Sequence, residues 1–167
     1  MSISSPERLV GSVASLHIHA AVSGEPLISV ASVEAVEQMG LREDTRYFGR
    51  RAADGGPSAR QVTLMEREQM AKHATALGVE CFPPAAVRAN LETFGLDLVS
   101  LIGQSLQVGE AVLYLVKPRD PCEKMDRVRP GLRALMANHR QGVVAQVVRS
   151  GRIRVGDGIV VETNPDA

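Results

Sequence analysis

The stretch AVLYLVKPRDPCEKM, residues 111–125, joins an apolar run to a loop that holds a cysteine. Its first six residues have the composition of a core strand. Prolines stiffen the loop that follows, and three cations, Lys117, Arg119 and Lys124, surround Cys122. Because a loop at the end of a core strand is a rigid place for a functional side chain, the stretch predicts both a β core and the position of a site.

Cys122 has two interpretations. Neighbouring cations favour the thiolate form of a cysteine, which is the nucleophilic and metal-binding form, so Cys122 is a candidate reactive or metal-binding sulfur. Alternatively, it is a small apolar residue that fills space under the loop, a role that cysteine often takes. Cys81 lies beside Phe82 and two prolines with no cation within a few residues, and we interpret it as structural.

Apolar segments of strand length recur along the rest of the chain. Hairpins are predicted at residues 105–116, across Gly109 and Glu110, and at residues 142–155. Further strands are predicted at residues 9–20, 27–36, 86–97 and 159–162.

Two helices are predicted between these strands. One begins near Thr63 and Glu66, which have capping-box spacing, and the other begins near Pro130. The strand–helix alternation of a parallel sheet is not visible. We therefore expect a mainly β (α+β) fold, an antiparallel and partly closed β-barrel with a few peripheral helices.

The length of 167 residues favours a single domain spanning residues 1–167, with a core from about residue 10 to 162. With two cysteines, Cys81 and Cys122, the composition is typical of an intracellular protein with free thiols. No secretory signal and no apolar run of membrane-spanning length is seen, so we expect a cytoplasmic protein without a membrane partner. The sequence carries no signal for an oligomeric state.

The formal net charge is zero, but it is unevenly distributed. Residues 115–154 contain ten Lys and Arg against three Asp and Glu, whereas the remainder contains nine against sixteen. The neutral total and the scarcity of aromatic residues argue against a nucleic-acid partner. A cationic segment around Cys122 fits a small anionic ligand, although a solvated basic face explains most of these arginines equally well.

Three other places carry polar side chains that a site would need. His17 and His19 alternate along a strand and face the same way, so they either share a metal or, as we prefer, line a pocket or the surface. Arg88 and Asn90 leave the predicted strand at 86–97 on one face, where they either grip a phosphate or a heterocycle or satisfy buried carbonyls. The long polar loop at residues 39–60 contributes four further candidates, Arg42, Asp44, Arg46 and Tyr47.

Taken together, these motifs resemble the MOSC-domain family, the module named for the carboxyl-terminal part of molybdenum cofactor sulfurases and also found as free-standing bacterial proteins. The resemblance rests on Arg88-Ala-Asn90-Leu, on the Pro121-Cys122 loop, and on GVVAQVVRSGRIRVGD at residues 142–157. These segments follow the family order across nearly the whole chain. The family fold is a mostly β barrel, as expected above.

The resemblance implies a site for the molybdenum cofactor (molybdopterin). The family cysteine corresponds to Cys122, which either ligates molybdenum or carries sulfur as a persulfide. A thiolate is a soft ligand suited to such a metal, and the phosphate of the pterin needs cations. Candidates for the phosphate are Arg46, Arg88, Arg119 and Lys124, and Asn90 is the candidate for the edge of the heterocycle.

One segment departs from the family pattern. Members often carry Gly-Leu-x-Gly-Asp-Arg in the long loop, whereas residues 40–47 read GLREDTRY, with Glu43 in place of the glycine and a residue inserted before Arg46. The cysteine desulfurase domain of the sulfurases, with its pyridoxal phosphate lysine, is also absent from this chain. The chain therefore needs another protein as its sulfur donor.

Three functions follow from the resemblance. The first is a small molybdenum oxidoreductase that reduces N-hydroxylated substrates, with Cys122 in the catalytic site and electrons from a partner protein, because no iron–sulfur, flavin or nicotinamide motif is present. The second is a carrier that stores, delivers or sulfurates the cofactor without turnover. The third is an interaction module that has lost its ligand.

Overall fold

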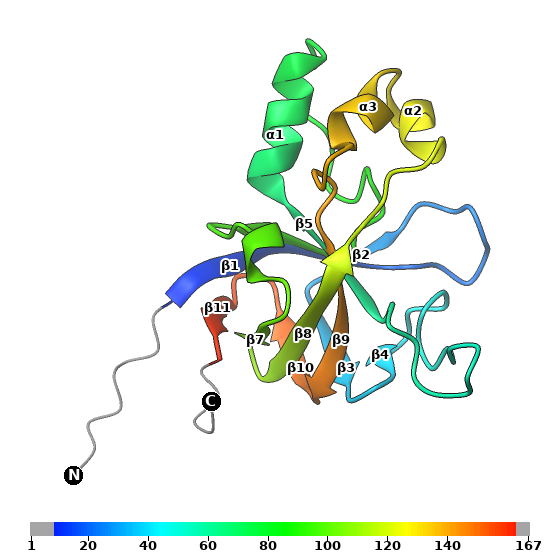
Figure 1. Ribbon diagram of the computed structural model, residues 1–167, viewed down its shortest axis with the longest axis vertical. Coiled ribbons are helices and arrows are strands. Elements are labelled where there is room, and N and C mark those ends of the chain that lie inside the picture. Colours follow the sequence, from blue (N-terminus) through cyan, green and yellow to red (C-terminus); the bar gives the residue numbers. More distant parts are fainter. Residues whose placement is uncertain (1–8, 163–167) are drawn as a thin grey trace.

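A computed structural model describes residues 9–162, in which strands predominate. Figure 1 shows the strands crossing at the centre of the molecule and the helices α1, α2 and α3 gathered at one end. The strands are β1 (Leu9–Ile18), β2 (Ile28–Val30), β3 (Ser32–Val36), β4 (Gly40–Leu41), β5 (Val62–Glu66), β6 (Leu91–Phe94), β7 (Ser105–Val108), β8 (Ala111–Pro118), β9 (Val143–Arg149), β10 (Gly151–Arg154) and β11 (Gly158–Val161). The helices are α1 (Arg67–Ala76), α2 (Lys124–Val128), α3 (Leu132–Met136) and the 3₁₀ helix η1 (Val99–Leu101).

Seven strands close into a barrel in the order β11-β7-β8-β9-β5-β6-β1, and the ring is completed because β1 pairs with both β6 and β11. The predicted mainly β barrel with peripheral helices is confirmed. Two details differ from the prediction. The barrel is fully closed, and β5 and β6 run parallel, with α1 as the crossover between them.

The remaining strands lie outside the ring. β2 pairs with the far half of β1, whereas β3 pairs with β4 and β10 in a separate three-stranded sheet. The single strand predicted at residues 27–36 is therefore two strands in two sheets, interrupted at Ala31. The hairpin predicted at residues 142–155 was also wrong, because β10 leaves β9 and pairs with β3.

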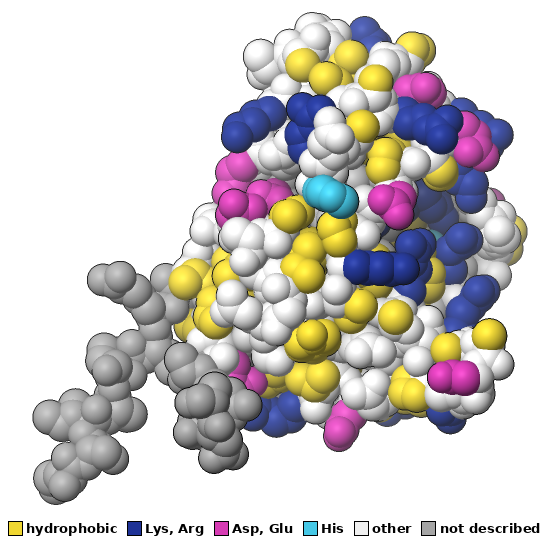
Figure 2. Space-filling view, in the orientation of Figure 1, with side chains coloured by type: hydrophobic (Ala, Val, Ile, Leu, Met, Phe, Trp, Pro, Cys, Tyr) yellow, Lys and Arg dark blue, Asp and Glu magenta, His cyan; other side chains and the backbone are white. Residues whose placement is uncertain are grey.

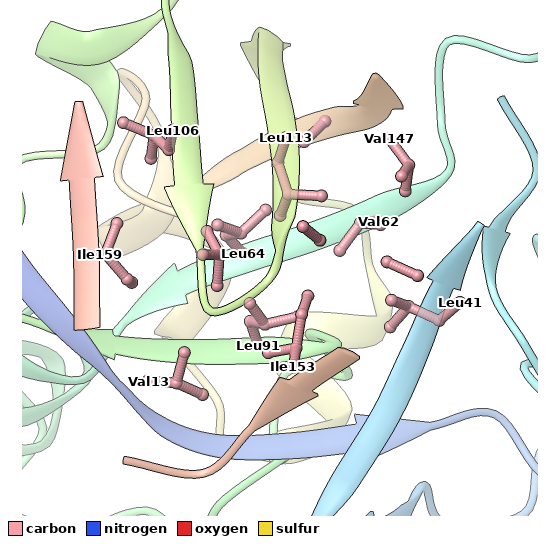
Figure 3. Packing of buried hydrophobic residues seen from close by; sticks show 14 of the residues in the cluster. Val13, Leu41, Val62, Leu64, Leu91, Leu106, Leu113, Val147, Ile153 and Ile159 are labelled. Atoms are coloured by element: carbon pink, nitrogen blue, oxygen red, sulfur yellow. The ribbon is translucent and has the colours of Figure 1, made fainter. Parts of the chain in front are cut away.

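Aliphatic side chains fill the barrel. They come from every strand of the ring and from the neighbouring sheet, and Figure 3 shows Leu64, Leu91, Leu113 and Ile153 converging on its centre. All four are completely buried. The alternation of inward apolar residues on these strands is what the sequence pattern predicted, and burial of so many large side chains is the main source of stability.

A second apolar cluster joins the helices to the barrel. It contains Met65, Met70, Val87, Ala89, Met125, Leu132 and Met136. The capping box predicted at Thr63 and Glu66 is not formed, because both residues belong to β5 and Thr63 is completely buried in the barrel wall. Helix α1 begins only at Arg67, and the side chain of Glu66 makes no capping hydrogen bond.

Four loops meet beside this second cluster. They follow β1, β4 and β8 and precede β6, so segments far apart in sequence are brought together below α2 and α3. Within residues 9–162, no helix has the length and apolar character needed to cross a membrane. The prediction that one domain spans residues 1–167 reaches beyond the described residues and stays a prediction.

Candidate functional site

The four loops enclose a cavity of about 430 Å³. Its lining contains six cationic side chains and one acidic one, together with a cysteine, and Figure 2 shows Lys and Arg gathered around a hollow on the right-hand side, below the helices. The lining residues are His19, Ser23, Gly24, Arg46, Tyr47, Arg60, Val87, Arg88, Arg119, Asp120, Cys122, Lys124, Met125, Arg127 and Gln141. A cavity of this size and charge suits a small anionic molecule.

Cys122 lies in the wall of this cavity, half-buried, four residues after the end of β8. Its carbonyl oxygen accepts the backbone N–H of Met125 at 3.0 Å, at the start of α2. Because Met125 is buried in the second apolar cluster, this bond ties the cysteine loop to a packed part of the molecule. Cys81, which we expected to be structural, is exposed and does not line the cavity.

Arg119 is the most constrained cation of the cavity. Its side chain is buried, and Nη2 donates a hydrogen bond to the carbonyl oxygen of Val87 at 3.1 Å, whereas Nη1 is buried without a partner in the described structure. Burial lowers the pKa of Arg119 to about 10; coulombic interactions with Tyr47 and Cys122 oppose this effect, whereas the charge of Arg60 adds to it. At pH 7 the guanidinium therefore still carries a positive charge.

Gln141 supplies a second unsatisfied group in the same cavity. Its Nε2 donates to the sulfur of Met125 at 3.4 Å, and its Oε1 is buried with no partner among the described residues. An unpaired buried acceptor is costly, as is an unpaired buried donor. The lining residues of the cavity thus include one buried donor, from Arg119, and one buried acceptor, from Gln141, that have no partner among the described residues.

The other predicted cations also border the cavity. Arg46 and Lys124 are exposed, with the guanidinium of Arg46 5.7 Å from the ring centre of Tyr47. Arg88 is half-buried, and its Nη1 donates to the carbonyl oxygen of Glu25 at 3.0 Å. It lies in the loop before β6, not in the strand predicted at 86–97.

Sequence reasoning missed several residues of the cavity. Arg60 and Arg127 are exposed cations on loops or helices with no motif around them, and Gln141 precedes β9 without any distinguishing neighbour. Only the general cationic excess of residues 115–154 signalled Arg127. Gln141 gave no signal, because its importance lies in a missing hydrogen bond that only the fold reveals.

Asn90 lies beneath the cavity and does not line it. Its Oδ1 accepts the backbone N–H of Thr63 at 3.0 Å and the hydroxyl of Thr63 at 3.1 Å. Its Nδ2 donates to the carbonyl oxygen of His17 at 3.1 Å and to Oδ2 of Asp44 at 3.0 Å. The amide is completely buried and already paired, so it has no free group for a heterocycle edge, contrary to our expectation.

Asp44 organises the long loop next to the cavity. Oδ1 accepts the backbone N–H groups of Arg46 and Tyr47, at 3.1 and 2.9 Å, and Oδ2 accepts from His19 and Asn90. The carboxylate is 2% exposed, so these bonds fix the path of the loop. The departure from the family pattern at Glu43 leaves this anchor in place.

His17 and His19 do not form a metal site with other side chains, because no group of three or more His, Cys, Asp or Glu side chains in residues 9–162 is arranged to hold a metal. His17 is completely buried, and its Nδ1 donates to the carbonyl oxygen of Ala89 at 2.9 Å. His19 is 4% exposed and lines the cavity, as we preferred for both histidines. For His17 this preference was wrong, because the residue is completely buried.

Comparison with solved structures shows the same fold. The YuaD protein from Bacillus subtilis superposes with a TM-score of 0.72 at 23% identity, over 92% of this chain and 96% of that one. The YiiM proteins from Escherichia coli and Geobacillus stearothermophilus give TM-scores of 0.66 and 0.63 at 20% and 18% identity. They cover 92% and 93% of this chain and 70% and 75% of their own lengths.

Sequence comparison identifies the family. No curated protein matches the chain significantly. The family model for the MOSC domain matches residues 28–160, which include every cationic residue of the cavity and Cys122. This match covers most of the chain and agrees with the barrel fold, so the chain belongs to the MOSC domain family.

Proposed function

We propose that the protein binds the molybdenum cofactor in the cavity beside Cys122 and uses it to reduce N-hydroxylated compounds. The MOSC family is associated with this cofactor. The observation that carries the proposal is Nη1 of Arg119, a charged donor that is buried without a partner among residues 9–162, on a side chain that lines the same cavity as the cysteine.

An unpaired buried cation is a large cost in a folded protein unless a ligand provides the counter-charge. The cofactor carries a phosphate, which would pair with Arg119 and with exposed cations such as Arg46 and Lys124. The neutral total charge of the chain does not weaken this argument, because only Asp120 among the cavity residues is acidic.

The other cavity residues also suit this group. The thiolate of Cys122 is a soft ligand of the kind that binds molybdenum. The unpaired Oε1 of Gln141 would accept a hydrogen bond from an N–H of the pterin, the role that we first expected of Asn90. Val87 and Met125 contribute apolar surface for the ring, and 430 Å³ lies within the range of ligand pockets.

When bound, the cofactor supplies two-electron redox chemistry at the metal. The chain itself would orient the substrate against Cys122, hold anionic groups with its arginines and exclude water on the buried side of the cavity. The electrons would come from a partner protein. We also expect this activity to take place in the cytoplasm.

The test is molybdenum and pterin analysis of protein purified from cells that make the cofactor. We expect near-stoichiometric molybdenum and pterin in the parent and loss of both in Cys122→Ala, with retention in the matched variant Cys81→Ala. The loaded parent should then reduce an N-hydroxylated base with an artificial electron donor, and Cys122→Ala should not.

Other outcomes would separate the alternatives. Bound cofactor without reduction of any N-hydroxylated substrate favours a carrier that stores or sulfurates the cofactor. Absence of both molybdenum and pterin from a well-folded parent contradicts the proposal and leaves a sulfur carrier or an interaction module.

A further inference from the structure

His19 and Asp44 form a buried pair at the edge of the cavity. Nδ1 of His19 lies 2.8 Å from Oδ2 of Asp44, and the backbone N–H of His19 donates to the same oxygen at 2.9 Å. The two side chains come from segments 25 residues apart, the end of β1 and the long loop. The pair is therefore a product of the fold and not of local sequence.

Hydrogen bonds keep the Asp44 side chain in its ionised form. Burial alone would raise the pKa of Asp44, but hydrogen bonds from the His19 ring and from the backbone N–H groups of His19 and Tyr47 hold it below the usual value. An ionised carboxylate only accepts hydrogen bonds, so Nδ1 of His19 must carry a proton. This fixes the tautomer of the neutral ring and leaves its second nitrogen, Nε2, as the site that gains or loses a proton.

His19 lines the cavity, and Nε2 is the ring nitrogen that Asp44 does not bind. Nε2 makes no hydrogen bond with the described residues. It is also not fully buried, in contrast to Nε2 of His17, which is buried without a partner among these residues. His19 also borders a second, smaller cavity of about 140 Å³, so it lies where the two cavities adjoin.

The charged groups that border the two cavities with His19 are mostly cationic. The ring of Tyr47 meets the imidazole edge-on with centroids 5.0 Å apart, and Asp44 is its anionic neighbour. The titratable and charged residues that border the two cavities with it are Arg46, Tyr47, Arg50, Arg60, Arg88, Arg119, Asp120, Cys122, Lys124 and Arg127. Protonated Nε2 would donate a charge-assisted hydrogen bond to an anion that enters the cavity.

We propose that His19, oriented by Asp44, is the proton donor of the cavity, and that it transfers a proton from Nε2 to the ligand bound beside Cys122. This inference rests on the proposed function for its substrate class, an N-hydroxylated compound. The arrangement of an imidazole between a buried carboxylate and an open site is that of a general acid–base group.

The reaction consumes protons, and His19 can supply one of them. Reduction of R–NH–OH to R–NH₂ and water consumes two electrons and two protons. The Nε2–H bond of His19 breaks, its proton passes to the hydroxyl oxygen, and the N–O bond breaks as that oxygen leaves as water. A one-electron carrier protein supplies the two electrons in turn, solvent protonates the nitrogen, and solvent then reprotonates His19.

The first test uses the protein without cofactor and sulfate as the probe, because the charge of sulfate does not change between pH 5 and 9. We expect sulfate to bind about tenfold more tightly at pH 5.5 than at pH 8, and saturation to move the NMR titration midpoint of His19 up by about one pH unit. His19→Gln should bind sulfate with less than a twofold dependence on pH. An unmoved His19 titration in the wild type, or no sulfate binding at all, overturns the inference.

The second test uses the loaded enzyme. We expect kcat to fall by about 100-fold in His19→Gln, with loss of the pH limb that follows the measured titration of His19, while molybdenum content stays at the parent level. The wild-type rate and pH profile in His19→Gln would overturn the inference. Failure of the proposed function would appear separately, as protein without molybdenum that still shows the sulfate linkage.

Discussion

Arg119 donates from Nη2 to the carbonyl oxygen of Val87 at 3.1 Å, while its Nη1 has no partner within the described structure. One hydrogen bond thus holds the guanidinium in place, while another of its donor groups stays without an acceptor among the described residues. A core optimised for stability alone would not retain such a charge, because burial of an unpaired cation opposes folding. The relationship therefore supports the proposal that Arg119 binds the ligand.

Arg119→Met should separate stability from binding. Methionine fills a similar volume without a charge, so we expect the free energy of unfolding to stay equal or rise by about 1–2 kcal/mol. Anion and cofactor binding should fall by at least tenfold, because the buried donor is lost. Urea denaturation and sulfate titration measure the two effects.

Arg133→Met on α3 is the matched control, since Arg133 is exposed and does not line the cavity. Arg133→Met should change neither the free energy of unfolding nor the affinity for sulfate. Marked destabilisation by Arg119→Met with unchanged sulfate binding would show that Arg119 is a structural residue.

Asp44→Asn should destabilise the protein. The two carboxylate oxygens accept five N–H groups, and either orientation of an asparagine would turn its own NH₂ group toward at least two of those donors. We expect a loss of about 2–4 kcal/mol at pH 7.

The loss should depend on pH in a defined direction. The pKa of Asp44 in the folded protein is lowered, so its contribution is complete above the unfolded-state value of about 4 and is lost as the pH falls through the folded value. The difference in the free energy of unfolding between wild type and Asp44→Asn should therefore become smaller below pH 4. Glu37→Gln, at an exposed carboxylate, is the control and should show no such difference.

The sequence predicted the barrel, and the grouping of Cys122 with Arg119, because both depend on local patterns. Alternating apolar residues mark the strands, and Cys122 and Arg119 stand together on one loop. The roles of Asn90 and Gln141 depend on which groups across the fold are already paired, and that information is not local. The side-chain amide of Asn90 is fully hydrogen-bonded, whereas Oε1 of Gln141 has no partner among the described residues.

Two errors in the fold have the same origin. β9 and β10 are separated by one residue and look like a hairpin, but β10 pairs with β3, more than a hundred residues away. Thr63 and Glu66 match a capping box, but burial of the whole segment between β9 and β6 makes it a strand. In both cases tertiary pairing overrides the local preference.

Glu66→Gln should stabilise the protein at high pH. Burial, with Asp97 and Glu68 nearby, raises the pKa of Glu66 to about 7. The ionised carboxylate is therefore less favourable in the folded protein than in the unfolded chain, and it lowers the free energy of unfolding. For a carboxyl group with a raised pKa, stability is highest below the unfolded-state value and falls as the pH rises toward the folded value. We expect Glu66→Gln to gain roughly 2 kcal/mol at pH 8 and little at pH 4.

Thermal unfolding between pH 4 and 9 measures this effect. Glu80→Gln, at an exposed site outside this acidic cluster, should leave the profile unchanged. A pH-independent gain in Glu66→Gln would contradict the assignment of the titration to Glu66.

Gly142→Ala should disrupt the cavity as well as the fold. Gly142 has φ +78°, and a Cβ there would collide with the carbonyl group of Leu64 on β5. Its own carbonyl oxygen accepts the backbone N–H of Arg119 at 3.0 Å, and Gln141 precedes it. Movement of this residue would therefore displace both unsatisfied groups of the cavity, and we expect a loss of at least about 3 kcal/mol together with weaker sulfate binding.

Gly156→Ala separates the collision from the cost of the backbone conformation. Gly156 has φ +90°, but a Cβ there would meet nothing within 4 Å. Alanine should cost only about 1 kcal/mol at this position, the cost of the left-handed conformation itself, and sulfate binding should be unchanged. Equal losses of stability in the two variants would mean that the backbone moves to avoid the collision with Leu64 at little cost. The predicted displacement of Arg119 and Gln141 by Gly142→Ala would then be contradicted.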